Sequence, residues 1–186
     1  MSVRIAKSAG FCFGVSRAVE LVEQAAAAGK KVATLGPIIH NRHVVDKFEK
    51  MGVRVIEQPE EANADETVII RSHGVTREVV QRLEATGAEI IDATCPFVKR
   101  IHSIVSREEE KGRLPVIIGT PTHPEVEGIA GWCSDCRVLP AEKILKNGRT
   151  LWKIPRIRQY AWFHRRLALN LCGNRAVILQ KNSLLT

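Results

Sequence analysis

The chain has 186 residues and lacks any hydrophobic run long enough to cross a membrane. Its first residues also lack the apolar segment and cleavage site of a secretory signal peptide. We therefore expect a cytoplasmic protein that does not associate with membranes. The five cysteines are odd in number and widely spaced, which argues against a disulfide framework and favours metal or redox roles.

Acidic residues are missing from the C-terminal part of the chain. All 20 Asp and Glu residues lie at or before Glu142, whereas residues 144–186 hold nine Lys and Arg residues. Residues 1–143 hold 19 basic and 20 acidic residues, so the formal net charge of +8 comes entirely from the tail. A basic tail of this kind can bind nucleic acid.

Two common catalytic loops are also absent. Gly10 and Gly14 flank Cys12 but have neither the dinucleotide-binding nor the P-loop spacing. No Gly-x-Ser-x-Gly elbow occurs, which argues against a serine hydrolase of the α/β type.

Short β-branched runs alternate with helical patterns, which predicts an α/β fold with mostly parallel sheets flanked by helices. Strands are expected at 3–6, 32–35, 53–56, 67–70, 89–92, 115–118 and 137–139, and helices at 15–29, 41–51, 76–86, 96–111, 124–129 and 141–145. The pattern restarts at Pro96. We therefore expect two similar small lobes at 1–95 and 96–143, of which the second is incomplete. A divergent basic tail follows at 144–186, with weak strand patterns at 167–171 and 176–179.

Two cysteines each lie at the start of an expected helix. Cys12 precedes an amphipathic run, and Cys95 is followed by Pro96, a favoured first helical residue. The positive end of a helix lowers the pKa of a thiol and favours the thiolate. Since thiolates bind soft metals and iron–sulfur clusters, these cysteines are candidate ligands of a site gathered from separate lobes.

Three histidines share a setting just past an apolar run, namely His40, His73 and His123. Ligands of open α/β sheets bind beyond the carboxyl ends of the strands. Any one of these imidazoles could simply cap a turn, but the repeated context favours binding of an anion such as diphosphate, or of a metal. The remaining histidines lack this context and are expected to be surface or packing residues: His43, His102 and His164.

Glu125 and a cysteine pair complete the candidates. Glu125 lies two residues after His123, where a carboxyl can transfer a proton, but a first-turn acid can equally favour the helix dipole. Cys133 and Cys136 form a Cys-x-x-Cys pair, which could be half a zinc site or a redox pair. Because no second pair follows, we interpret them as two incidental thiols.

Five motifs then occur in order along the chain. They are Gly10-Phe11-Cys12-Phe13-Gly14-Val15-Ser16-Arg17-Ala18, Gly36-Pro37-Ile38-Ile39-His40-Asn41, Ser72-His73-Gly74-Val75, Asp92-Ala93-Thr94-Cys95-Pro96 and His123-Pro124-Glu125-Val126-Glu127-Gly128. Together they closely resemble the 4-hydroxy-3-methylbut-2-enyl diphosphate reductase family over about residues 1–143.

The resemblance implies three α/β lobes around a 4Fe-4S cluster held by three cysteines. Cys12 and Cys95 would be cluster ligands, and Glu125 would lie on the proton path. The substrate would be bound, chiefly through its diphosphate, by His40, His73 and His123. The implied reaction removes the hydroxyl of this allylic diphosphate as water and gives isopentenyl and dimethylallyl diphosphates, with electrons from a donor such as ferredoxin or flavodoxin.

The tail departs from the family pattern. The third cysteine motif and the phosphate-binding loop are not found, and the context of Cys172 does not match. We expect a truncated member without its third lobe, with a reading-frame change near residues 144–150 and impaired reductase activity. One alternative is an inactive remnant, and another is a metal-binding module that uses Cys133 and Cys136. A third is a nucleic-acid binder acting through the tail; we do not favour it because it explains only one segment of the sequence.

Overall fold

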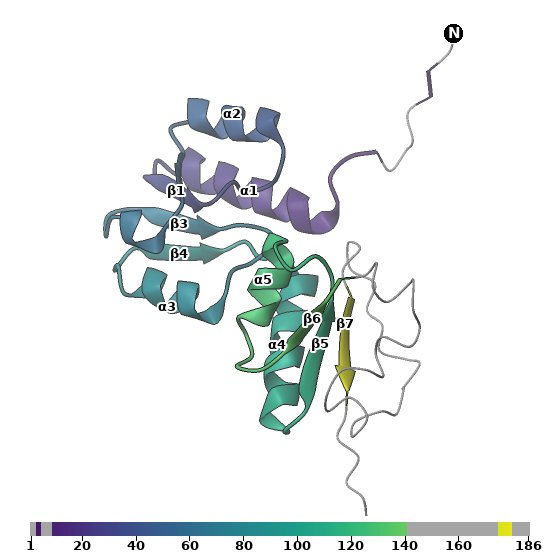
Figure 1. Cartoon of the computed structure of the whole chain (residues 1–186). Coiled ribbons are helices and arrows are strands. Elements are labelled where there is room, and N and C mark those ends of the chain that lie inside the picture. Colours follow the sequence, from purple (N-terminus) through teal and green to yellow (C-terminus); the bar gives the residue numbers. More distant parts are fainter. Residues whose placement is uncertain (1–2, 5–8, 141–174, 180–186) are drawn as a thin grey trace, which may run out of the picture. The chain divides into compact units, whose positions relative to one another are not determined.

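The computed structural model describes residues 3–4, 9–140 and the backbone of 175–179 (Figure 1). The chain divides into two compact units. The first comprises residues 1–72 and 82–96, and the second comprises residues 73–81 and 97–186. None of the described helices is both long and apolar enough to pass through a bilayer.

The first unit is built on a four-stranded parallel sheet. Its elements are α1 (Phe13–Ala27), β1 (Val32–Leu35), α2 (Arg42–Lys50), β2 (Arg54–Ile56), the 3₁₀ helix η1 (Pro59–Glu61), β3 (Thr67–Ile70) and β4 (Glu89–Asp92). The strand order is β2-β1-β3-β4, and all three pairings are parallel. Helix α3 (Arg77–Glu84) begins in the second unit and ends in the first.

The strand order places a topological switch between β1 and β3. From β1 the chain moves to β2 on one side, and it then returns to add β3 and β4 on the other side. The loops that leave β1 and β3 therefore diverge at the carboxyl ends of two neighbouring strands. This is where open α/β sheets bind their ligands.

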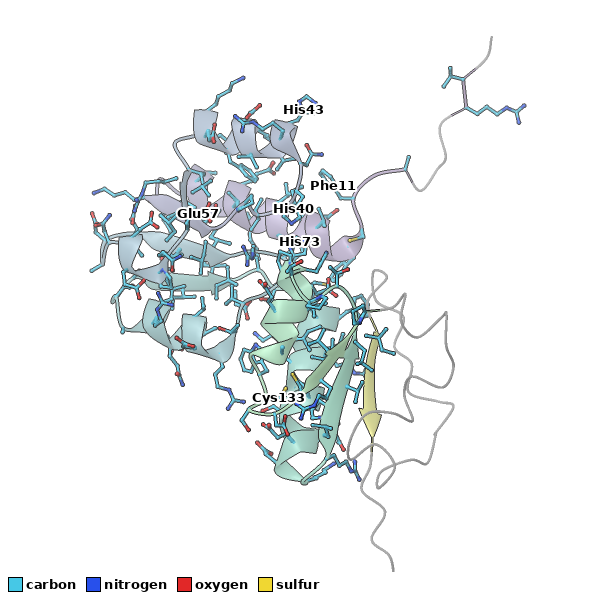
Figure 2. The ribbon with its side chains drawn as sticks, in the orientation of Figure 1. Phe11, His40, His43, Glu57, His73 and Cys133 are labelled. Atoms are coloured by element: carbon cyan, nitrogen blue, oxygen red, sulfur yellow. The ribbon has the colours of Figure 1, made fainter. Side chains whose placement is uncertain are left out.

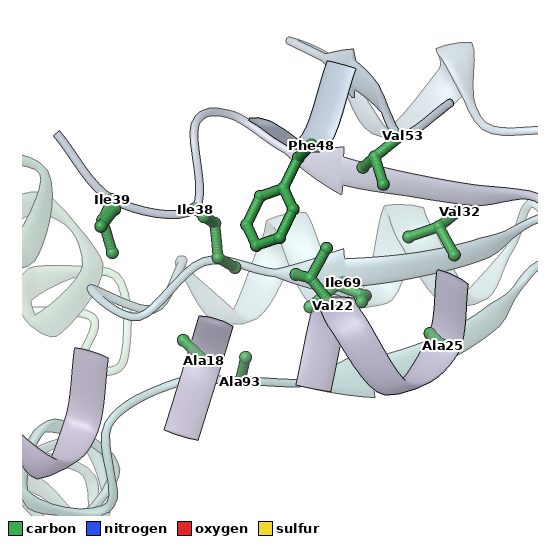
Figure 3. Packing of buried hydrophobic residues seen from close by; sticks show 10 residues of the cluster. All are labelled: Ala18, Val22, Ala25, Val32, Ile38, Ile39, Phe48, Val53, Ile69 and Ala93. Atoms are coloured by element: carbon green, nitrogen blue, oxygen red, sulfur yellow. The ribbon is translucent and has the colours of Figure 1, made fainter. Parts of the chain in front are cut away.

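The core of the first unit forms between the helices and the sheet (Figure 3). Ala18, Val22 and Ala25 recur every three or four residues of α1, so they share one face and are buried. They pack with residues of the strands, loops and α2, namely Val32, Ile38, Ile39, Phe48, Val53, Ile69 and Ala93. Burial of this apolar surface fixes α1 and the loop after β1 on the sheet.

In its described residues, the second unit contains a three-stranded sheet, two helices and the first part of α3. Its elements are α4 (Pro96–Glu110), β5 (Leu114–Ile118), α5 (Pro124–Ala130), β6 (Arg137–Leu139) and β7 (Arg175–Leu179). β5 lies in the middle, parallel to β6 and antiparallel to β7. The buried core consists of Ile101, Val105, Ile117, Val126 and Ile129.

The structure confirms the expected α/β class and most of the elements. Strands β1, β3, β4 and β6 have the expected bounds, and the strand expected at 176–179 is present as β7. The strand expected at 3–6 is not found at Val3 and Arg4: both side chains are exposed, whereas parallel strands are buried on both faces. Residues 5–6, and the elements expected at 141–145 and 167–171, lie outside the described residues.

Candidate functional site

Cys12 is the N-cap residue of α1. Its backbone is extended (φ −66°, ψ 163°), and its carbonyl oxygen accepts a hydrogen bond from Ser16 N at 2.9 Å. The side chain is exposed, and no side-chain cap bonds to the first turn. The N–H groups of that turn attract negative charge, so this end of α1 suits an anionic ligand or a thiolate.

The thiol of Cys95 lies against the first turn of the same helix. An ideal Cβ built on Gly14 would stand 2.5 Å from Cys95 Sγ and 3.0 Å from Cys95 Cβ. Gly14 therefore leaves the space that the Cys95 thiol occupies. The first unit thus brings Cys95 to the end of α1 that begins at Cys12, although 82 residues separate the two cysteines along the chain.

Arg17 holds the segment that leads to Cys95. Its Nη1 donates to the carbonyl oxygen of Thr94 and its Nη2 to that of Asp92, both at 3.3 Å. Arg17 lies three residues after Gly14, on the same side of α1. Arg17 was expected only as a member of the first motif, because no local pattern signals its contact with Asp92 and Thr94.

Ser72 links the loops that follow three adjacent strands. Its backbone N and its Oγ donate to the carbonyl oxygen of Ile38, at 3.4 and 3.2 Å. Its own carbonyl oxygen accepts from Cys95 N at 2.9 Å. Since Ile38 is two residues before His40 and Ser72 directly precedes His73, this buried serine fixes the backbone from which candidate residues project.

Arg71 brings positive charge to the same strand ends. Gly36, directly after β1, has φ +68°, and an ideal Cβ there would lie 2.6 Å from Arg71 Nη1. The guanidinium therefore occupies the space over Gly36. Arg71 Nε is buried and has no hydrogen-bond partner within the part of the chain that the structure describes.

His40 belongs to the first unit and is exposed (Figure 2). It directly precedes Asn41, the N-cap residue of α2, whose Oδ1 accepts from His43 N at 3.0 Å. His43 is exposed on α2, so it is a surface residue as expected.

His73, His123 and Glu125 belong to the second unit. The rings of His73 and His123 lie edge to face, with centroids 6.2 Å apart and planes at 81°. His123 is the N-cap residue of α5, and its Nδ1 accepts from Glu125 N at 3.2 Å. A neutral His123 ring therefore carries its proton on Nε2, which is left to act as a donor. The Glu125 side chain is buried in the first turn of α5.

His102 is a packing residue, as expected. It is buried in α4 and stacks on Trp132, with ring centroids 5.1 Å apart and planes at 16°. His164 and Cys172 lie outside the described residues.

No group of three or more His, Cys, Asp or Glu side chains in the described residues is arranged to hold a metal ion. A metal-binding module built on Cys133 and Cys136 therefore lacks a further ligand from this part of the chain.

An open parallel α/β sheet with candidate ligand residues beyond its strand ends defines an α/β protein of the kind that binds ligands at that edge. The chain belongs to the LytB protein family, whose model matches residues 3–162. The match continues past residue 143, where the resemblance by motifs ends.

Curated relatives agree with this family. The chain is 48% identical over 139 residues to a 4-hydroxy-3-methylbut-2-enyl diphosphate reductase of Caldanaerobacter subterraneus, covering 73% of this chain and 48% of the relative. It is 41% identical over 157 residues to the enzyme of that name from Alkaliphilus oremlandii, covering 83% and 54%. The chain thus spans about half the length of the curated relatives that it matches.

Solved structures of similar proteins carry related titles. The E-1-hydroxy-2-methyl-but-2-enyl-4-diphosphate reductase from Plasmodium falciparum matches with a TM-score of 0.68 at 29% identity, covering 72% of this chain and 42% of that chain. An (E)-4-hydroxy-3-methyl-but-2-enyl diphosphate reductase, the terminal enzyme of the non-mevalonate pathway, matches with a TM-score of 0.65 at 42% identity, covering 77% and 53%.

Proposed function

We propose that this chain carries a large part of the active site of a 4-hydroxy-3-methylbut-2-enyl diphosphate reductase. The observation that carries the proposal is the Cys95 thiol, which lies against the first turn of the helix capped by Cys12. Two thiols at one positive helix end suit an iron–sulfur cluster better than a disulfide framework or a hydrolytic site.

The residues present fit two ligands of a 4Fe-4S cluster. Cys12 and Cys95 would hold it, Gly14 would leave room for the Cys95 thiol, and Arg17 would keep the Asp92–Thr94 segment in place. When bound, the cluster supplies electrons and a Lewis-acidic iron for an alcohol oxygen.

The anionic end of the substrate would meet imidazole and guanidinium groups. His123 offers its Nε2–H as a donor to a phosphate oxygen, because its Nδ1 is engaged by Glu125 N. His73 lies edge to face with His123 and would bind the same diphosphate, together with His40. The guanidinium of Arg71, with its buried Nε, adds positive charge at the strand ends of the first unit.

Glu125 would deliver a proton to the departing hydroxyl. Loss of an allylic hydroxyl as water consumes two electrons and two protons, and a buried carboxyl beside a histidine N-cap is placed to supply one proton. A small electron carrier such as ferredoxin or flavodoxin would provide the electrons. The products would be isopentenyl and dimethylallyl diphosphates.

Iron uptake by the chain tests the cluster ligands. The purified chain is incubated anaerobically with iron and sulfide, and bound iron and visible absorption are measured. We expect Cys12→Ser and Cys95→Ser each to abolish the iron that the unmodified chain retains, whereas Cys136→Ser retains it in full. Equal iron in all four proteins would contradict the assignment of Cys12 and Cys95.

A chimaera tests the activity within a whole enzyme. The segment of this chain that matches the Caldanaerobacter relative replaces the corresponding segment of that relative. We expect the chimaera to reduce 4-hydroxy-3-methylbut-2-enyl diphosphate with a reduced viologen dye as donor. Glu125→Gln should lower kcat with little change in KM, and His123→Asn should raise KM. A folded, iron-loaded chimaera without turnover would refute the proposed function.

A further inference from the structure

Cys133 and Cys136 form a pair of neighbouring thiols outside the proposed cluster site. They lie in the loop between α5 and β6, half-buried against the core of the second unit (Figure 2). The Cys133 thiol donates to the carbonyl oxygen of Ala130 at 3.4 Å. Each thiol changes the pKa of the other through a hydrogen bond between them, so the two side chains are neighbours.

A carboxylate from α4 fixes the turn between the two cysteines. Glu109 Oε1 accepts from Ser134 N at 2.6 Å, from Ser134 Oγ at 2.7 Å and from Asp135 N at 2.8 Å. Burial raises the pKa of Glu109, but the donors on Asp135 and Ser134 outweigh it and hold that pKa below its usual value. The carboxylate therefore stays charged at neutral pH and keeps the backbone folded around the pair.

The hydrogen bond between the thiols makes them unequal. It lowers the pKa of Cys136 to about 7, and the positive charge of Arg137 acts in the same direction. The same hydrogen bond, together with burial, raises the pKa of Cys133. Cys136 is thus the nucleophile of the pair, and Cys133 is the thiol that reacts second.

We propose that Cys133 and Cys136 form a reversible dithiol–disulfide site that is separate from the proposed reductase chemistry. The geometry supports this site because the two thiols are neighbours on one short turn, and Glu109 holds the backbone of that turn in place. The spacing alone had suggested two incidental thiols, and the contact with Glu109 changes that interpretation.

The oxidant is a low-molecular-weight disulfide, such as oxidised glutathione. The Cys136 thiolate attacks one sulfur of this disulfide, a mixed disulfide forms and one thiolate leaves. Cys133 then loses its proton and attacks the Cys136 sulfur, which forms the Cys133–Cys136 bond and expels the second thiolate. Two electrons pass to the oxidant, and excess thiol reverses both steps.

The loop that carries this pair also touches the segment after His73. Trp132, directly before Cys133, donates from Nε1 to the carbonyl oxygen of Val75 at 2.9 Å. Arg77 N donates to the carbonyl oxygen of Gly131 at 3.3 Å, and the Arg77 guanidinium lies 5.3 Å from the Trp132 ring centroid. The backbone next to the pair is therefore hydrogen-bonded to the segment after His73.

Peptide mapping tests the site without interference from the other cysteines. Trypsin places Cys133 and Cys136 together in residues 114–137, whereas Cys12, Cys95 and Cys172 fall in residues 8–17, 83–99 and 167–175. The full-length reduced chain is incubated at pH 7 with oxidised glutathione, quenched with acid, alkylated and digested. We expect peptide 114–137 to become lighter by two hydrogen atoms and to lose both alkylation sites, and excess reduced glutathione should restore them.

Single variants separate this site from other outcomes. Cys133→Ser should accumulate glutathione on Cys136, whereas Cys136→Ser should leave Cys133 largely unmodified; Cys172→Ser serves as the control and should behave as the unmodified chain. In Cys172→Ser, iodoacetamide should alkylate Cys136 about threefold faster than an ordinary exposed thiol at pH 7. Persistence of both thiols under oxidation, or tight zinc on this pair that blocks oxidation, would overturn the proposal.

Discussion

Replacement of Gly14 by alanine should displace the Cys95 thiol. The added Cβ would lie 2.5 Å from Cys95 Sγ, which is about 0.9 Å closer than the 3.4 Å at which ordinary contact begins. The Cβ of Cys95 would also be only 3.0 Å away. Because Gly14 lies in α1, whose inner face is packed on the core, we expect the Cys95 side chain to move rather than the helix.

Two opposing contributions set the effect on stability. Forcing an extra methyl group into this contact costs about 1–3 kcal/mol. Alanine is favoured over glycine in a helix by up to about 1 kcal/mol, and by less in the first turn. We therefore expect the free energy of unfolding to fall by no more than about 3 kcal/mol, so that the variant remains folded.

The thiol should respond more strongly than the fold. Alkylation of Cys95, followed in the tryptic peptide 83–99, should change severalfold in rate, and iron uptake should fall by about tenfold or more. Gly128→Ala is the matched control, because an added Cβ in α5 would find its nearest neighbours at 3.6 Å. If Gly14→Ala left both the reactivity of Cys95 and the unfolding free energy unchanged, the inferred contact between α1 and Cys95 would be wrong.

Other predictions concern groups whose hydrogen bonds stabilise each unit internally. Arg54 holds the pKa of the buried Glu66 below 4.5. Glu66→Gln should therefore lower the free energy of unfolding by about 2 kcal/mol at pH 7. A carboxyl with a depressed folded-state pKa stabilises above its unfolded pKa, so urea unfolding should show the difference shrinking as the pH falls below 4.5. His123→Ala should cost about 1 kcal/mol through loss of the N-cap, and His123→Asn should restore thermal stability without restoring diphosphate affinity. Ser72→Ala removes the hydrogen bond from Ser72 Oγ and should lower the free energy of unfolding, measured in urea, by about 1 kcal/mol. Thr67→Ser on β3 is the control: it keeps its hydroxyl group and should lower that free energy less.

The strands were predictable because their signals are local. β1 and β3 are short runs rich in β-branched residues and bounded by glycine or polar residues, and both are buried throughout, as expected for inner parallel strands. β4 lies at the edge of the sheet and is only partly buried, but its two isoleucines still signal a strand. The short helix η1 was not predicted, because its signal lies in its capping residues and not in a hydrophobic pattern. Pro59 lies at its start, and Gln58 and Glu61 cap one another.

The contacts that shape the candidate site and the Cys133–Cys136 pair could not be predicted in the same way. Arg17 and Thr94 are 77 residues apart, and Glu109 and Ser134 are 25 residues apart. No periodicity in the sequence signals that such residues will meet, because their approach depends on how α1 and α4 pack on their sheets. The sequence could therefore name Cys95 as a candidate, but not the glycine and arginine that accommodate it.

Strand register explains why residues so far apart reach one site. Leu35, Ile70 and Asp92 are the last residues of β1, β3 and β4, and the pairing places Leu35 opposite Ile70 and Ile70 opposite Asp92. The three strands therefore end level with one another, and the loops that follow them start side by side at the same edge of the sheet. Ser72 can then bond to both neighbouring loops at once, which a slip of one residue in any pairing would prevent. The candidate site thus depends on the register of the sheet as much as on its own side chains.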